Sequence, residues 1–63
     1  MIYQFLATCF EDIEALATLD IIRRAGLEIS TVSITGEKTV VSAHGVGVVA
    51  DALPGLHIVA ALL

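Results

Sequence analysis

The residue types that could do chemistry gather in one short stretch of this 63-residue chain, where an apolar run gives way to carboxylates. Glu11, Asp12 and Glu14 lie in this stretch, directly after Cys9, the only cysteine. Parallel α/β folds bind ligands where a strand ends and a helix begins, so Glu14 is a candidate site residue. The alternative is a solvated glutamate that stabilises the positive end of a helix dipole.

Cys9 permits two interpretations. A helix N-terminus can lower the pKa of a nearby thiol, which would make Cys9 a redox-sensing residue beside Glu14. A lone cysteine among apolar residues is otherwise an inert small hydrophobe, and no adjacent base is visible in the sequence. A thiol pKa near the ordinary value of about 8.5 would remove the basis of the redox hypothesis.

The two histidines, His44 and His57, are too few and too far apart to predict a metal site with the acidic residues. His44 is best explained as a loop residue. Gly45 and Gly47 precede a strand-like run, whereas a dinucleotide-binding loop must precede a helix. The sequence therefore predicts neither a metal nor a cofactor.

Composition excludes several classes of function. The formal net charge is −4 with only three lysines and arginines, which argues against nucleic-acid binding. Apolar runs fall short of the roughly 20 residues of a membrane span, and the start resembles no signal peptide. One cysteine cannot form an internal disulfide, so we expect a cytoplasmic protein. Apolar residues reach 57% against 16% charged, and this excess predicts a covering partner or further chain.

The elements that must position these residues follow from periodicity. Ile2 to Thr8 predicts a buried strand, and a helix begins at Asp12 and ends before Gly26. Leu27 to Ile34 predicts a second strand, and Thr39 to Ser42 with Val46 to Val49 predict an edge hairpin. The helix carries two apolar sides, which are Ile13, Leu16, Ala17 and Ile21 on one and Ala15, Leu19 and Ile22 on the other.

This order predicts an α/β fold that opens with a βαβ unit and continues into a hairpin. A parallel sheet needs helices on both faces, and one helix leaves the other face bare. Residues 57–63 permit either a further strand or a terminal helical turn.

Several segments together resemble the N-terminal part of the ThiJ/PfpI family, which includes the Parkinson-disease-associated deglycase and YajL-like proteins. The segments are Phe10 to Ala15, Asp20 to Ile29, Thr31 to Ser33, Ser42 to Val46 and Ala50 to Leu53. The similarity covers residues 1–53, whereas residues 54–63 form a divergent apolar tail with a possible extra strand.

The resemblance implies an incomplete flavodoxin-like, doubly wound fold of the class I glutamine-amidotransferase-like type. It also implies a homodimer to whose interface the first helix contributes, with deglycase, glyoxalase, chaperone or protease-like roles in oxidative-stress protection. Small carbonyl substrates such as methylglyoxal adducts belong to the full-length family. In the family the carboxyl matching Glu14 bonds a reactive cysteine on a strand-to-helix elbow. His44 lies in a stretch near the active-site side of relatives, where it is either a peripheral substrate or dimer contact or a plain loop residue.

The family's chain is roughly three times as long, and Cys9 does not match its cysteine elbow. We therefore expect a truncated chain that keeps Glu14 but lacks the nucleophile and is inactive alone. The alternative is a small α/β interaction module that folds by oligomerisation or by docking onto another chain.

Overall fold

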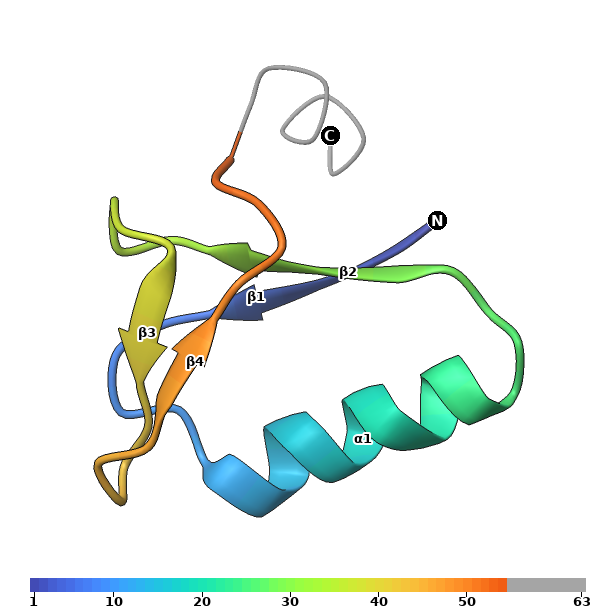
Figure 1. Ribbon diagram of the computed structural model, residues 1–63, viewed down its shortest axis with the longest axis horizontal. Helices are drawn as coiled ribbons and strands as arrows, with labels where there is room; N and C mark the ends of the chain where they lie inside the picture. The colour runs from blue at the N-terminus through green and yellow to red at the C-terminus, as the bar shows by residue number, and fades with distance from the viewer. Residues whose placement is uncertain (55–63) are drawn as a thin grey trace.

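The computed structural model describes residues 1–54, which form one helix and four strands (Figure 1). The elements are β1 (Ile2–Leu6), α1 (Asp12–Arg24), β2 (Ile29–Ser33), β3 (Thr39–Val41) and β4 (Gly47–Val49). Their order confirms the predicted succession of strand, helix, strand and hairpin. The extra strand predicted in the tail falls on residues 55–63, which lie outside the described residues.

Strands β1 and β2 pair in parallel, and α1 connects them, as the sequence predicts for a βαβ unit. The register runs from Ile2 opposite Ile29 to Leu6 opposite Ser33. Both strands are shorter than predicted. The chain turns after Leu6, where Cys9 has a φ of 70°, and β2 begins only at Ile29 because the preceding residues connect it to α1.

Helix α1 has the bounds that its end signals predict. The Glu11 carboxylate accepts a hydrogen bond from the Ile13 amide at 3.1 Å and caps the N-terminus, while Arg23 and Arg24 occupy the last turn. Gly26 follows with a φ of 80°, a conformation that ends helices.

The helix turns one apolar side toward the sheet and the other toward solvent. Its half-buried apolar residues are Ala15, Leu16, Leu19 and Ile22. Ile13, Ala17 and Ile21 are exposed, and no residue of α1 is fully buried. Leu16 therefore lies on the sheet side, which corrects its predicted grouping with Ile13.

Strands β3 and β4 pair antiparallel, with Val40 opposite Val48, which confirms the predicted hairpin. Among residues 1–54 this pair forms a sheet of its own and does not extend the edge of the β1–β2 pair. Instead of the hairpin, Ala52 pairs with β2, through a parallel bridge to Val32. The chain thus returns to the first sheet after the hairpin.

The core lies where the end of β1 meets the hairpin and the start of α1. Leu6, Val40 and Ala50 are at most 2% exposed, and half-buried Phe10 and Ala15 pack against them. Burial of a leucine or valine side chain, such as Leu6 or Val40, contributes about 1.5–3 kcal/mol. This core fixes the hairpin loop beside the N-terminus of α1.

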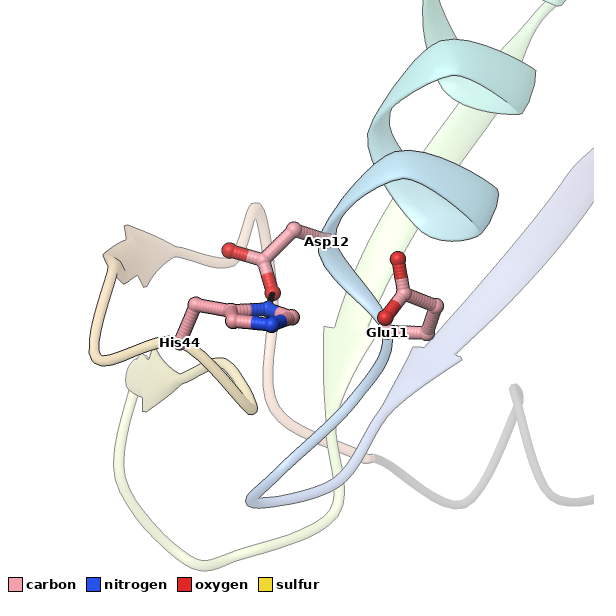
Figure 2. A group of neighbouring side chains, drawn as sticks. All are labelled: Glu11, Asp12 and His44. Atoms are coloured by element: carbon pink, nitrogen blue, oxygen red, sulfur yellow. Dashed lines mark hydrogen bonds and ion pairs between the residues drawn. The ribbon is translucent and has the colours of Figure 1, made fainter.

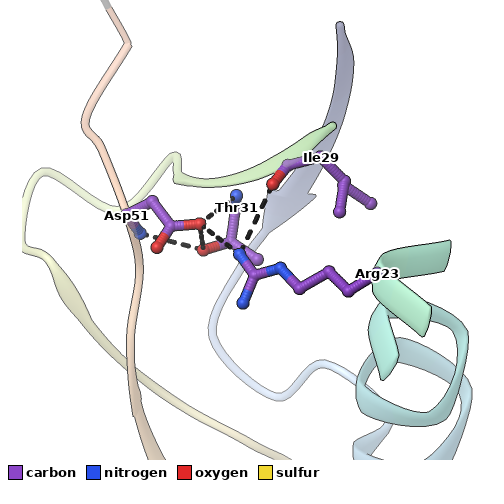
Figure 3. Close-up of polar contacts among 4 residues, drawn as sticks. All are labelled: Arg23, Ile29, Thr31 and Asp51. Atoms are coloured by element: carbon purple, nitrogen blue, oxygen red, sulfur yellow. Dashed lines mark hydrogen bonds and ion pairs between the residues drawn. The ribbon is translucent and has the colours of Figure 1, made fainter. Parts of the chain in front are cut away.

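Asp51 ties the returning segment to β2 and to α1 (Figure 3). Its Oδ2 atom accepts hydrogen bonds from the Thr31 amide at 2.9 Å and the Thr31 hydroxyl at 3.1 Å, and it pairs with Arg23 at 2.8 Å. The Asp51 amide donates in return to Thr31 Oγ1 at 2.9 Å. The Thr31 amide lowers the pKa of Asp51 most, and Arg23 lowers it further.

The 13 residues of α1 are too few to cross a bilayer, and residues 1–54 contain no helix that meets the length and apolarity of a membrane span.

Candidate functional site

The candidate site lies at the N-terminus of α1, at the carboxyl end of β1. Figure 1 shows the hairpin and the first turn of α1 at the same end of the β1–β2 pair. Two backbone hydrogen bonds fasten the connecting turn to the hairpin. The Cys9 amide donates to the Val41 carbonyl at 2.8 Å, and the Ala43 amide donates to the Phe10 carbonyl at 2.9 Å.

Glu14 lies in the first turn of α1, where the sequence places it. Its side chain is exposed, and it makes no side-chain hydrogen bond or ion pair within residues 1–54. The carboxylate is thus presented at the end of a parallel strand. This is the position where α/β folds place ligand-binding groups.

Cys9 is exposed in the turn between β1 and α1. Its φ of 70° is a left-handed conformation that non-glycine residues adopt at a cost. Among residues 1–54 its thiol makes no side-chain hydrogen bond, so none joins it to Glu14. The reactivity of Cys9 stays a prediction.

His44 is a loop residue, as predicted, but it has a specific partner. Its Nδ1 atom lies 3.0 Å from Asp12 Oδ1, and Figure 2 shows the ring reaching from the β3–β4 loop toward Glu11 and Asp12. The hydrogen bond to Asp12 raises the pKa of His44, and the charge of Glu11 acts in the same direction. The imidazole therefore holds a proton more readily than a free histidine.

Asp12 is the centre of this arrangement. Its Oδ2 atom accepts a hydrogen bond of 2.6 Å from the hydroxyl of Ser42, which is 3% exposed. This hydrogen bond lowers the pKa of Asp12 most, and the bond to His44 lowers it further. The Ser42 hydroxyl is itself fixed, because its oxygen accepts hydrogen bonds from the backbone amides of His44 at 3.3 Å and Val46 at 3.0 Å.

Ser42, Asp12 and His44 do not form a nucleophilic triad. In such a triad the histidine lies between the serine and the aspartate and takes the proton from the hydroxyl. Here both the Ser42 hydroxyl and the His44 ring bond Asp12, so the carboxylate lies in the middle. The serine is also buried, and residues 1–54 enclose no pocket.

One carboxylate oxygen each from Glu11 and Asp12 and one nitrogen of His44 lie within 4.8 Å of one another. The sequence alone does not group these residues, because 32 positions separate Asp12 from His44 and only the fold brings them together. The sequence feature that comes nearest to indicating this cluster is the pair of polar residues Ser42 and His44 at the end of a short predicted strand.

These elements define the N-terminal portion of a flavodoxin-like α/β fold, with a carboxylate cluster where β1 meets α1. The chain belongs to the DJ-1/PfpI family, whose profile matches residues 1–55. This confirms the family predicted from the acidic stretch and the helix end. No curated protein matches the chain.

Two solved structures support the same assignment. A DJ-1 superfamily protein from Salmonella typhimurium, crystallised as a cysteine-to-alanine mutant, is 38% identical with a TM-score of 0.80. Oxidized DJ-1 from Toxoplasma gondii is 36% identical with a TM-score of 0.81. Each match covers 82% of this chain, and the chain spans 28% of the length of each structure.

Proposed function

We propose that this chain supplies the carboxylate part of a DJ-1/PfpI-type cysteine-dependent site, which acts on small carbonyl adducts in a deglycase or glyoxalase reaction. The observation that supports this proposal is the place of Glu14. It is an exposed carboxylate in the first helical turn after β1, within the segment that matches the family. A carboxyl there can hydrogen-bond a thiolate brought to the same edge of the sheet.

The 63-residue chain by itself is expected to be inactive toward methylglyoxal. Cys9 is its only thiol, lies in an exposed turn and has no base bonded to it within residues 1–54. Thiol activation requires an adjacent base or a lowered pKa. Chaperone and protease-like roles stay predictions from the family resemblance, and a cytoplasmic location stays a prediction from the single cysteine.

A chimaera tests the role of Glu14. Residues 1–53 replace the matching N-terminal segment of the Salmonella protein in its form with the native cysteine, and the alkylation rate of that cysteine is measured against pH. Glu14→Gln is expected to shift the pH profile of the thiol, because a carboxyl no longer shares its proton. Glu28→Gln, which removes another exposed carboxylate, is the control. Equal profiles for both variants would refute the proposed role.

The isolated chain is tested separately for methylglyoxal consumption. We expect only stoichiometric loss through addition to the exposed thiol of Cys9. Repeated turnover that survives Cys9→Ala would contradict the predicted inactivity.

The exposed side of α1 favours a second candidate function, association of two chains as a dimer. Ile13 is 74% and Ile21 65% exposed, and Ala17 lies between them at helical spacing. Glu14 in the first turn and Arg24 in the last turn are exposed at helical spacing from Ala17 and Ile21, so antiparallel helices would set opposite charges side by side. We infer a homodimer through this side of α1.

The oligomeric state tests this candidate by analytical ultracentrifugation with circular dichroism. Ile21→Lys is expected to give a monomer, because it places a charge in the apolar contact. Val49→Lys is the matched control, since Val49 is 70% exposed but lies on β4. A dimer that survives Ile21→Lys and is lost with Val49→Lys would assign the interface to the hairpin instead.

A further inference from the structure

The side chains at the N-terminus of α1 have the separations that ligands of one metal ion require. Two ligand atoms about 2.1 Å from one ion, at the angles of tetrahedral or octahedral coordination, lie about 3.0–3.4 Å apart. His44 Nδ1 and Asp12 Oδ1 are 3.0 Å apart. One carboxylate oxygen of Glu11 lies within 4.8 Å of a ligand atom of each of the other two residues. A change of rotamer in this exposed side chain would close the remaining distance, at the expense of its hydrogen bond to the Ile13 amide.

One ligand is already oriented. The Asp12 side chain is 17% exposed, and Ser42 holds its Oδ2 atom through a buried hydroxyl. Oδ1 is thereby directed toward His44 (Figure 2). Hydrogen bonds of this kind from outside the ligand set fix the carboxylates of metal sites. Ser42 is not a ligand itself, and the backbone of the β3–β4 loop fixes its position.

Charge and ligand type select the class of ion. Two carboxylates and one neutral imidazole carry a charge of −2, which balances a divalent cation and outweighs the positive end of the helix dipole. Imidazole favours transition metals such as Zn²⁺, Co²⁺ and Ni²⁺, whereas Ca²⁺ and Mg²⁺ prefer oxygen ligands alone.

We propose that Glu11, Asp12 and His44 bind one divalent transition-metal ion of the zinc class, with water completing its coordination. The ion replaces the proton of the His44–Asp12 hydrogen bond, and that proton passes to solvent. It links the first turn of α1 to the β3–β4 loop. The site does not include Glu14, so it goes beyond the proposed function and stands independently of it.

Titration of the 63-residue chain with Zn²⁺ by isothermal calorimetry tests the proposal, with Co²⁺ absorption as a second readout. We expect one ion per chain and at least about tenfold weaker binding for His44→Gln and Glu11→Gln, the order of loss seen when metal sites are altered. His44 is exposed, and Glu11→Gln keeps an oxygen that can accept the hydrogen bond of the Ile13 amide, so circular dichroism should show the fold intact.

Matched controls separate the site from general effects. His57→Gln removes the other histidine, Glu28→Gln removes an equal charge, and Cys9→Ser removes the thiol. Each should bind Zn²⁺ within about twofold of the unchanged chain, since none belongs to the ligand set. Ca²⁺ should bind at least about tenfold more weakly than Zn²⁺.

Several results would overturn the assignment. They are no saturable Zn²⁺ binding, equal affinity for Ca²⁺, or equal losses for Glu28→Gln and Glu11→Gln. Loss of binding with Cys9→Ser or His57→Gln would place the ion elsewhere, and one ion shared by two chains would contradict the proposed stoichiometry.

Discussion

Replacement of Asp51 by alanine is expected to destabilise the chain far more than its exposure implies. The Asp51 side chain is 46% exposed, as is typical of a surface carboxylate. Its Oδ2 atom, however, accepts a hydrogen bond from the backbone amide of Thr31, a residue that is 3% exposed. Removal of the acceptor leaves that donor buried without a partner.

The magnitude follows from the contacts that are lost. An unsatisfied buried amide costs about 1–3 kcal/mol. The ion pair with Arg23 is half exposed and adds at most about 1 kcal/mol. Thr31 Oγ1 still accepts a hydrogen bond from the backbone amide of residue 51 after the substitution, so the Thr31 hydroxyl adds little to the loss of stability. The expected loss is about 1–4 kcal/mol, a large share of the roughly 3–9 kcal/mol of unfolding free energy expected for a chain of this size.

Urea unfolding at pH 7, followed by far-UV circular dichroism at one protein concentration, measures the loss. Asp20→Ala is the matched control, because within residues 1–54 Asp20 pairs only with Arg24, four residues along α1, and its loss should cost about 0.3–0.5 kcal/mol. Asp51→Asn keeps an acceptor oxygen and should fall between the two. Faster hydrogen exchange at the Thr31 amide should accompany Asp51→Ala. A loss within 0.5 kcal/mol of the control, a margin of about the size of surface effects, would refute this reasoning.

Three further perturbations test other parts of the structure. Because hydrogen bonds lower the pKa of folded Asp51 below the ordinary 3.8, its contribution to stability is complete above that pH and is lost as the pH falls through the lowered value. Acid unfolding of Asp51→Asn should therefore be less steep than that of the unchanged chain, and identical curves would contradict this linkage. Leu6→Ala should cost about 2–5 kcal/mol, because it empties the centre of a small core, whereas Ile34→Ala at a 55% exposed position should cost less than about 1 kcal/mol in the same urea assay. Cys9→Gly should raise stability by about 0.5–1 kcal/mol, since glycine adopts the φ of 70° without strain, and a loss would show that the thiol contributes packing that outweighs it.

The sequence by itself determined the elements and the family. Helix α1 begins at Asp12 and ends at Arg24, as its acidic start, its basic end and Gly26 indicate. These are local signals, because capping and dipole interactions act within one turn of the chain. The parallel strands and the hairpin followed from equally local patterns of β-branched residues and turns.

Only the tertiary structure decided what those elements bring together. The sequence identified His44 as a loop residue and Asp12 as the start of a helix, but not that they share a hydrogen bond. Asp51 likewise falls in a segment that the sequence marks only by its family resemblance, and the fold makes its carboxylate the acceptor of the hydrogen bond from the buried Thr31 amide. Such contacts depend on how the core of Leu6, Val40 and Ala50 sets the hairpin against the helix, and packing between distant segments leaves no periodic signal in the sequence.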